Sequence, residues 1–177
     1  MTKKKLVGYH GTSLENAQLI LKEQHFKDSI KDNEWLGKGV YFFQYLHHAQ
    51  WWISHSRFAG KKQSILQAVL LYADEQLLDL DDPVELERLF SVLKYMIEKR
   101  KDSSTSRKLN EDLTLNQRRC LACNLICQIR PEIGMIIYTF PSDSGNNIFT
   151  DVTGFFRNQR QICVKDHSII TKVEEAK

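Results

Sequence analysis

Two hydrophobic periods alternate along the chain, and together they predict short strands interleaved with helices. Apolar or β-prone runs predict strands at residues 6–9, 40–43, 64–72, 134–140, 161–165 and 168–173. Apolar residues at helical spacing predict helices at residues 14–24, 47–58, 83–97 and 115–130. Residues 26–34 are polar and predict a loop. This succession favours an α+β domain around a curved sheet with flanking helices.

Three capping signals mark where helices are expected to begin. They are Thr12 with Glu15, Asp82 with Pro83, and Thr114 with Gln117. In a capping box, the hydroxyl accepts an N–H of the first turn while the acidic or amide side chain reaches back. We therefore expect Thr12 to cap the first helix and His10 to stand at the end of the strand before it.

The length of 177 residues suits one domain. We interpret residues 1–177 as a single unit with a helical insert at 83–130. Within the insert, residues 101–112 are charged and rich in serine, which predicts a linker. Residues 141–160 predict a second long polar loop. Loops of that length in a compact domain are usually functional or disordered.

Composition adds a weak preference for the partner and the compartment. Hydrophobic residues make up 42% and charged residues 27%, which is typical of a globular domain, and the net charge is +3. That balance permits a nucleic-acid partner without arguing for one. The basic residues 3–5 are not followed by an apolar run, and no stretch approaches the ~20 apolar residues of a membrane span. We expect a cytoplasmic protein without membrane contact.

Three of the four cysteines share one helical face. Cys120, Cys123 and Cys127 stand at i, i+3 and i+7, whereas Cys163 lies in an apolar strand. A metal site is one interpretation, but a fourth nearby ligand and the usual turn residues are absent. Burial of small thiols is the other, and we favour it. No metal ligand is therefore assigned.

Three segments carry a motif that suggests chemistry. Residues 8–13 read Gly-Tyr-His-Gly-Thr-Ser, residues 35–43 contain Gly-Lys-Gly before Val-Tyr-Phe-Phe, and residues 161–166 read Gln-Ile-Cys-Val-Lys-Asp. In this order they resemble the ADP-ribosyltransferase superfamily, in its poly(ADP-ribose) polymerase-like or diphtheria-toxin-like branch. The resemblance covers about 1–55 and 134–174, and it suggests a small bacterial or phage mono-ADP-ribosyltransferase toxin. It implies a split, curved sheet.

The resemblance implies a site for NAD as co-substrate. His10 would bond a ribose hydroxyl, and the backbone of Gly11 would grip the nicotinamide carboxamide. Tyr41 would stack on the nicotinamide ring, and Trp51 would cover its other face, with Trp52 as the alternative. The expected NAD-binding residues are His10, Gly11, Thr12, Gly39, Tyr41, His48 and Trp51, although His48 stands where relatives carry serine. The catalytic set is His10, Tyr41 and Gln161.

Gln161 departs from the family pattern, which has glutamate there. The glutamate bonds the nicotinamide-ribose hydroxyl and favours an oxocarbenium-like transition state. Because a charge-assisted hydrogen bond is roughly twice as strong as a neutral one, glutamine predicts slower chemistry or a reactive acceptor. The missing acid also argues against chain elongation and for transfer of a single ADP-ribose.

The acceptor is expected to contact the loop before Gln161. Gln159 stands where residue identity helps to select the acceptor, and Phe156 and Arg157 offer stacking and phosphate or acidic contacts. Arg160 offers the same kind of contact. The acceptor is a protein or a nucleic acid. A toxin or defence role is the expectation, with an antitoxin as a possible partner.

Three other functions stay open from the sequence. The glutamine at position 161 also suits a catalytically inactive module that binds NAD without turnover. An NAD-dependent RNA 2′-phosphotransferase shares the fold, but we cannot place its additional basic residues. A partner-binding protein that uses the helices at 83–130 would have no affinity for NAD.

Overall fold

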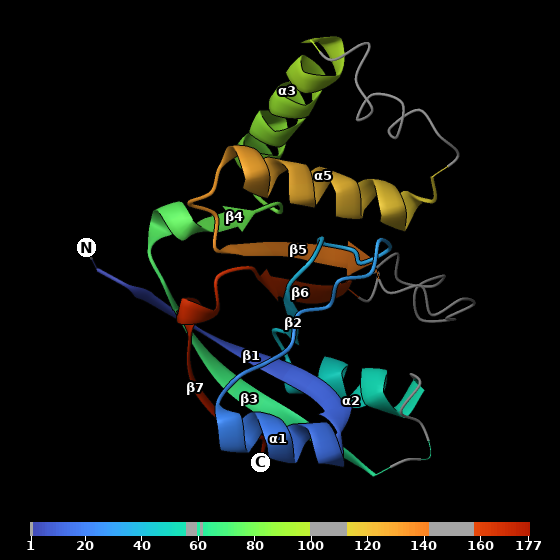
Figure 1. The fold of residues 1–177 in the computed structure, drawn as a ribbon, viewed down its shortest axis with the longest axis vertical. Coiled ribbons are helices and arrows are strands. Elements are labelled where there is room, and N and C mark those ends of the chain that lie inside the picture. Colours follow the sequence, from blue (N-terminus) through green and yellow to red (C-terminus); the bar gives the residue numbers. More distant parts are fainter. Residues whose placement is uncertain (1, 56–59, 61, 100–112, 142–157) are drawn as a thin grey trace, which may run out of the picture.

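A mixed sheet of seven strands organises the chain in this computed structural model, which describes residues 2–55, 60, 62–99, 113–141 and 158–177. The strands are β1 (Lys4–Ser13), β2 (Val40–Phe43), β3 (Gln63–Tyr72), β4 (Leu77–Asp79), β5 (Met135–Pro141), β6 (Asn158–Val164) and β7 (Ile170–Glu175). The helices are α1 (Leu14–Glu23), α2 (Leu46–His55), α3 (Pro83–Lys99) and α5 (Leu115–Ile129). Figure 1 shows α3 and α5 at one end of the molecule and α1 and α2 at the other.

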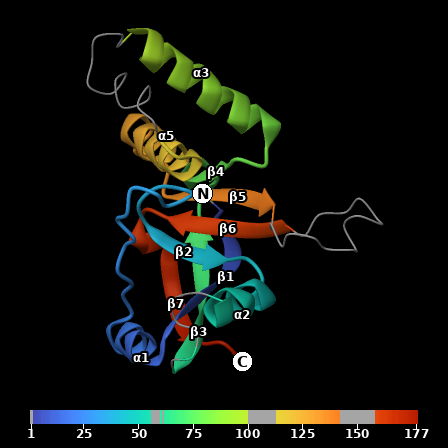
Figure 2. The same cartoon turned by 90° about the vertical axis from the view of Figure 1, so that its right-hand side faces the viewer.

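The strand order is β4-β5-β6-β2-β1-β3-β7, and only β4 and β5 pair in parallel. β1 pairs with β3 along its whole length, from Lys4 to Ser13. By contrast, β1 and β2 share one register pair, Tyr9 opposite Phe43. The α+β class is thus confirmed. Within the single sheet, this one pair joins β4-β5-β6-β2 to β1-β3-β7, which are called the two half-sheets below (Figure 2).

Alternation along the strands divides the interior into two cores. Successive side chains point to opposite faces of a sheet. Ile137 and Ile162 therefore pack with α1 and Phe26, whereas their neighbours Ile136 and Cys163 pack beneath α3 and α5. Cys120 and Cys123 of α5 are buried too, as the packing interpretation of the cysteine face predicts.

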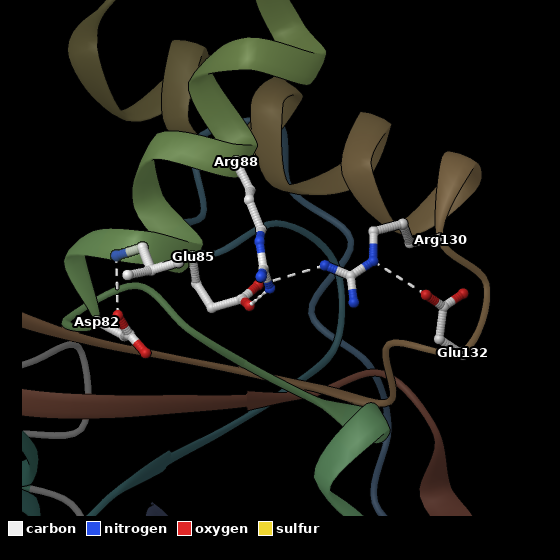
Figure 3. A network of polar contacts seen from close by, with 6 residues as sticks. Asp82, Glu85, Arg88, Arg130 and Glu132 are labelled. Atoms are coloured by element: carbon white, nitrogen blue, oxygen red, sulfur yellow. Dashed lines mark hydrogen bonds and ion pairs between the residues drawn. The ribbon is translucent and has the colours of Figure 1, made fainter.

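Helix α3 is tied to α5 by a short chain of charges (Figure 3). The Glu85 carboxylate bonds Arg88 one turn later and also lies 3.4 Å from the Arg130 guanidinium. Arg130 bonds Glu132 at 2.9 Å. Such half-exposed pairs contribute at most about 1 kcal/mol each, so apolar contacts such as Leu89 on Ile126 carry most of the packing.

The first predicted cap was wrong. β1 continues through His10 to Ser13, so His10 lies within a strand and not at its end. Ser13 is the N-cap of α1, and its hydroxyl accepts from the Asn16 N–H at 3.3 Å. Thr12 is only 4% exposed and pairs with Ser64 of β3. Pairing with a long neighbouring strand outweighed the local capping signal.

One other boundary shifted, one strand was not predicted, and one cap was confirmed. β6 begins at Asn158, so Gln161 stands inside the strand instead of leading it, because β6 pairs with β5 out to Pro141. The strand β4 was not predicted, since three residues are too few to show a period. Thr114 and Gln117 do form the expected capping box, with bonds of 3.3 and 3.0 Å.

Candidate functional site

A cleft of about 760 Å³ opens beside the junction of the two half-sheets. Eight residues proposed from the sequence line it: His10, Gly11, Gly39, Tyr41, Trp51 with its alternative Trp52, Gln159 and Gln161. They come from β1, from the loop before β2, and from β2, α2 and β6. The structure therefore brings the three motif segments to one place.

Strand register explains this convergence. β2 lies between β1 and β6, with Phe43 opposite both Tyr9 and Gln161. Tyr41 is opposite Cys163. Residues that face each other across antiparallel strands share a face of the sheet, so Tyr41 and Gln161 present their side chains on the same side.

The His10 imidazole spans the junction. Its Nδ1 lies 2.7 Å from the Tyr41 carbonyl oxygen. A carbonyl only accepts, so Nδ1 carries the proton and Nε2 is the acceptor in the neutral ring. Burial lowers the pKa of His10, although the bond to the Tyr41 carbonyl works in the opposite direction. Phe26 packs edge-on to the ring at 5.2 Å. The side chain is an oriented, neutral hydrogen-bonding group.

The Tyr41 hydroxyl is bonded to the loop before β2. It donates to the Gly37 carbonyl at 2.6 Å and accepts from the Leu36 N–H at 2.9 Å. Burial raises the pKa of Tyr41 far above its ordinary value, so the phenol stays protonated. Because both bonds fix the ring, a ligand meets the aromatic surface and not a free hydroxyl.

Gly11 allows α2 to approach the sheet closely. A Cβ at this position would lie 2.2 Å from Ile53 Cγ2 and 3.4 Å from the Trp52 ring. The glycine is thus required by helix packing, whatever role its backbone has toward a ligand. The close approach places Trp51, which is 49% exposed, and the half-buried Trp52 on one wall of the cleft. Trp51 also stacks on His55, with centroids 4.8 Å apart.

Gly39 allows the loop before β2 to adopt a backbone conformation that other residues rarely adopt. Its φ of 147° is rarely adopted by other residues, and a Cβ there would lie 2.4 Å from the Val164 carbonyl oxygen. Gly39 also exchanges two backbone hydrogen bonds with Ser29, of 2.9 and 3.1 Å. The Gly-Lys-Gly motif is therefore a device for packing this loop against β6.

Two glutamines of β6 form the base of the cleft. The Gln161 amide donates from Nε2 to Gln159 Oε1 at 3.3 Å. Gln159 is 8% exposed and still reaches the lining, whereas Gln161 is half-buried. The pair offers further amide donors and acceptors to a ligand.

Several proposed residues are not brought into the cleft. Thr12 is buried against β3, and His48 lies against Tyr45 and Phe43 outside the lining. Burial, and then the charge of His47, lowers the pKa of His48. The Arg160 guanidinium pairs with Asp79 at 2.5 Å and with Asp81 at 3.2 Å, which turns it toward β4. Phe156 and Arg157 lie outside the described residues.

The sequence interpretation missed one wall of the cleft. Lys27, Ser29, Lys31, Glu34 and Trp35 line it from the segment between α1 and β2, joined by Phe43, His55 and Pro141. Residues 26–34 have no period, so they predicted only a loop. The cluster of charged residues beside a tryptophan, immediately before the Gly-Lys-Gly turn, was the signal available.

This segment is fastened to the helical insert and to Lys165, which directly follows β6. The Lys31 carbonyl accepts from the Cys120 thiol at 3.5 Å, and Asp32 accepts from the Gln117 amide at 3.1 Å. The Leu36 carbonyl accepts from Lys165 Nζ at 2.7 Å. These bonds hold the polar groups of the loop in place over the cleft.

The fold and the site define an α+β protein with an aromatic-walled, partly basic cleft beside the β1–β2 junction of its sheet. The chain is 26% identical, over 187 aligned positions, to uncharacterized protein MJ0359 of Methanocaldococcus jannaschii, and the match covers 94% of this chain and 85% of that one. No family model matches the chain, and no solved structure matches it.

The described residues contain neither a membrane-spanning helix nor a cluster of metal ligands. No helix in the described ranges is both long and apolar enough to cross a bilayer. Among the same residues, no group of three or more His, Cys, Asp or Glu side chains is arranged to hold a metal ion.

Proposed function

We propose that the protein is an NAD-dependent mono-ADP-ribosyltransferase with an ADP-ribosyltransferase-like split sheet. The observation that carries this proposal is the convergence of His10, Tyr41 and Gln161, from three different strands, on one cleft. These are the residues that the three motif segments single out. The narrow junction between β1 and β2 supports the split-sheet assignment.

The lining suits NAD in size and chemistry. Ligand sites commonly enclose about 300–1,000 Å³, and this cleft has about 760 Å³. Tyr41 with Trp51 or Trp52 would hold the nicotinamide ring, since planar rings stack on aromatic walls. The ammonium groups of Lys27 and Lys31 would meet the pyrophosphate. His10 Nε2 would accept from a ribose hydroxyl.

The reaction would break the bond between the ribose carbon and the nicotinamide nitrogen, whose electron pair leaves with nicotinamide. The acceptor forms a new bond to that carbon and releases a proton to solvent. Gln161 would bond the ribose hydroxyl without adding charge. That neutrality favours transfer of one ADP-ribose unit over elongation.

Incubation with NAD labelled in its adenosine half tests the proposal. We expect nicotinamide release, with label on either a protein pool or a nucleic-acid pool, and the two pools separate the acceptor classes. His10→Ala is expected to abolish release, whereas His25→Ala, at an exposed position outside the lining, should not change it. Intact NAD and unlabelled pools would contradict the proposal.

An NAD-binding module without turnover is the second candidate, and the neutral Gln161 is the observation that favours it. Such a module would be stabilised by NAD, because a ligand that binds only the folded state raises the midpoint of unfolding. Thermal stabilisation without nicotinamide release would establish this alternative.

A further inference from the structure

Glu34 carries a carboxylate into the cleft. Among the described residues that line it, no other acidic side chain is present. Lys27 and Lys31 supply positive charge, and Gln159 and Gln161 are neutral. Loss of nicotinamide leaves positive charge on the ribose. Such charge is stabilised best by an opposite charge that is already in position.

The surroundings of Glu34 hold this carboxylate in place. Its Oε1 accepts a hydrogen bond from the Ser29 hydroxyl. Ser29 is fixed in turn by its two backbone bonds to Gly39. A carboxylate offers about four lone-pair positions, so it can bond Ser29 and still act on a ligand.

We propose that Glu34 is a catalytic residue, the negative charge that stabilises the cationic transition state of nicotinamide release; this inference rests on the proposed transferase function. In that step the ribose–nicotinamide bond breaks, and its electron pair leaves with nicotinamide. Water or the acceptor then bonds the ribose carbon and gives its proton to solvent. Glu34 contributes charge, and Gln161 contributes a neutral hydrogen bond.

The decisive experiment compares nicotinamide release by the wild type, Glu34→Gln, and the double variant Glu34→Gln with Gln161→Glu. The first change should lower the rate about a hundredfold, as removal of one electrostatic contact to a transition state typically does, while NAD still stabilises the protein against heat. The second change returns a carboxylate to the cleft and should restore the rate of nicotinamide release to about a tenth of the wild-type rate or more. Gln159 can bond either side chain at 161, because an amide both donates and accepts.

Control variants separate the remaining outcomes. Glu23→Gln, on the exposed end of α1, should leave the rate unchanged. Ser29→Ala frees the carboxylate without removing its charge and should cause a smaller loss, so the proposal stays testable even if Glu34→Gln fails to fold. A wild-type rate in Glu34→Gln, or no recovery in the double variant, would overturn the role of Glu34. If the wild type is not stabilised by NAD and releases no nicotinamide, the proposed transferase function itself is wrong.

Discussion

His10 Nδ1 and the Tyr41 carbonyl oxygen lie 2.7 Å apart at the point where β1 and β2 separate. The two strands share only one register pair, so a side chain replaces the backbone ladder beyond it. The residue that we propose to bind a ribose hydroxyl of NAD thus also joins the two half-sheets. Substitution of His10 is therefore expected to change both stability and any NAD chemistry.

The pH dependence of stability tests the state of His10. Burial lowers the pKa of His10 from 6.5. The unfolded ring gains its proton near pH 6.5 and the folded ring only at lower pH, so the free energy of unfolding falls as the pH drops below about 6.5. Between about pH 7 and about pH 5, urea unfolding of His10→Gln should show a shallower decline than the wild type. His25→Gln is the exposed control, and parallel curves for His10→Gln and the wild type would contradict the expectation.

Tyr41→Phe keeps the aromatic ring and removes the hydroxyl. The Leu36 N–H would lose its acceptor, and the Gly37 carbonyl would keep only the weak bond from the Cys163 thiol at 3.8 Å. Leaving such groups unsatisfied costs about 1–3 kcal/mol. Chemical denaturation should show that loss, whereas Tyr45→Phe, at a residue that is 50% exposed, should stay within about 0.5 kcal/mol of the wild type. Equal stability of the two variants would refute a structural role of the phenol.

Gly11→Ala should push α2 away from β1. The new methyl would lie 2.2 Å from Ile53 Cγ2, and overpacking of this kind typically costs about 1–3 kcal/mol. Ile53→Ala in the same chain removes the clash, so the double variant should be more stable than the sum of the single changes predicts. Thermal melts of the four proteins measure this coupling. Simple additivity would show that the helix does not rest on Gly11.

Neutralising Lys27 and Lys31 together should weaken NAD binding by about three- to tenfold and reduce its dependence on salt, since exposed charges are screened by ions. The exposed Lys22 of α1 provides the control for a general change in charge. Titration calorimetry at two salt concentrations measures both effects. An unchanged dissociation constant would exclude these lysines from the pyrophosphate contact.

Much of the architecture was predictable from local pattern. Alternating or continuous apolar runs predicted β2, β3, β5 and the core of β6, and the Thr114–Gln117 capping box marked the start of α5. The Gly-Lys-Gly segment indicated a turn from residue type alone, and the structure shows the reason at Gly39, whose φ of 147° suits glycine. These features depend on neighbours within a few residues, so the local sequence is enough to determine them.

Contacts between distant segments decided the rest. The pairing of β1 with β3 extended the strand past His10 and moved the cap to Ser13. The bonds from α5 and Lys165 to residues 31–38 turned an unpatterned loop into a wall of the cleft and brought Glu34 into it. Hydrophobic period and capping act along the chain, whereas strand partners and loop anchors are chosen by the packing of the whole domain, so only the tertiary structure could reveal them.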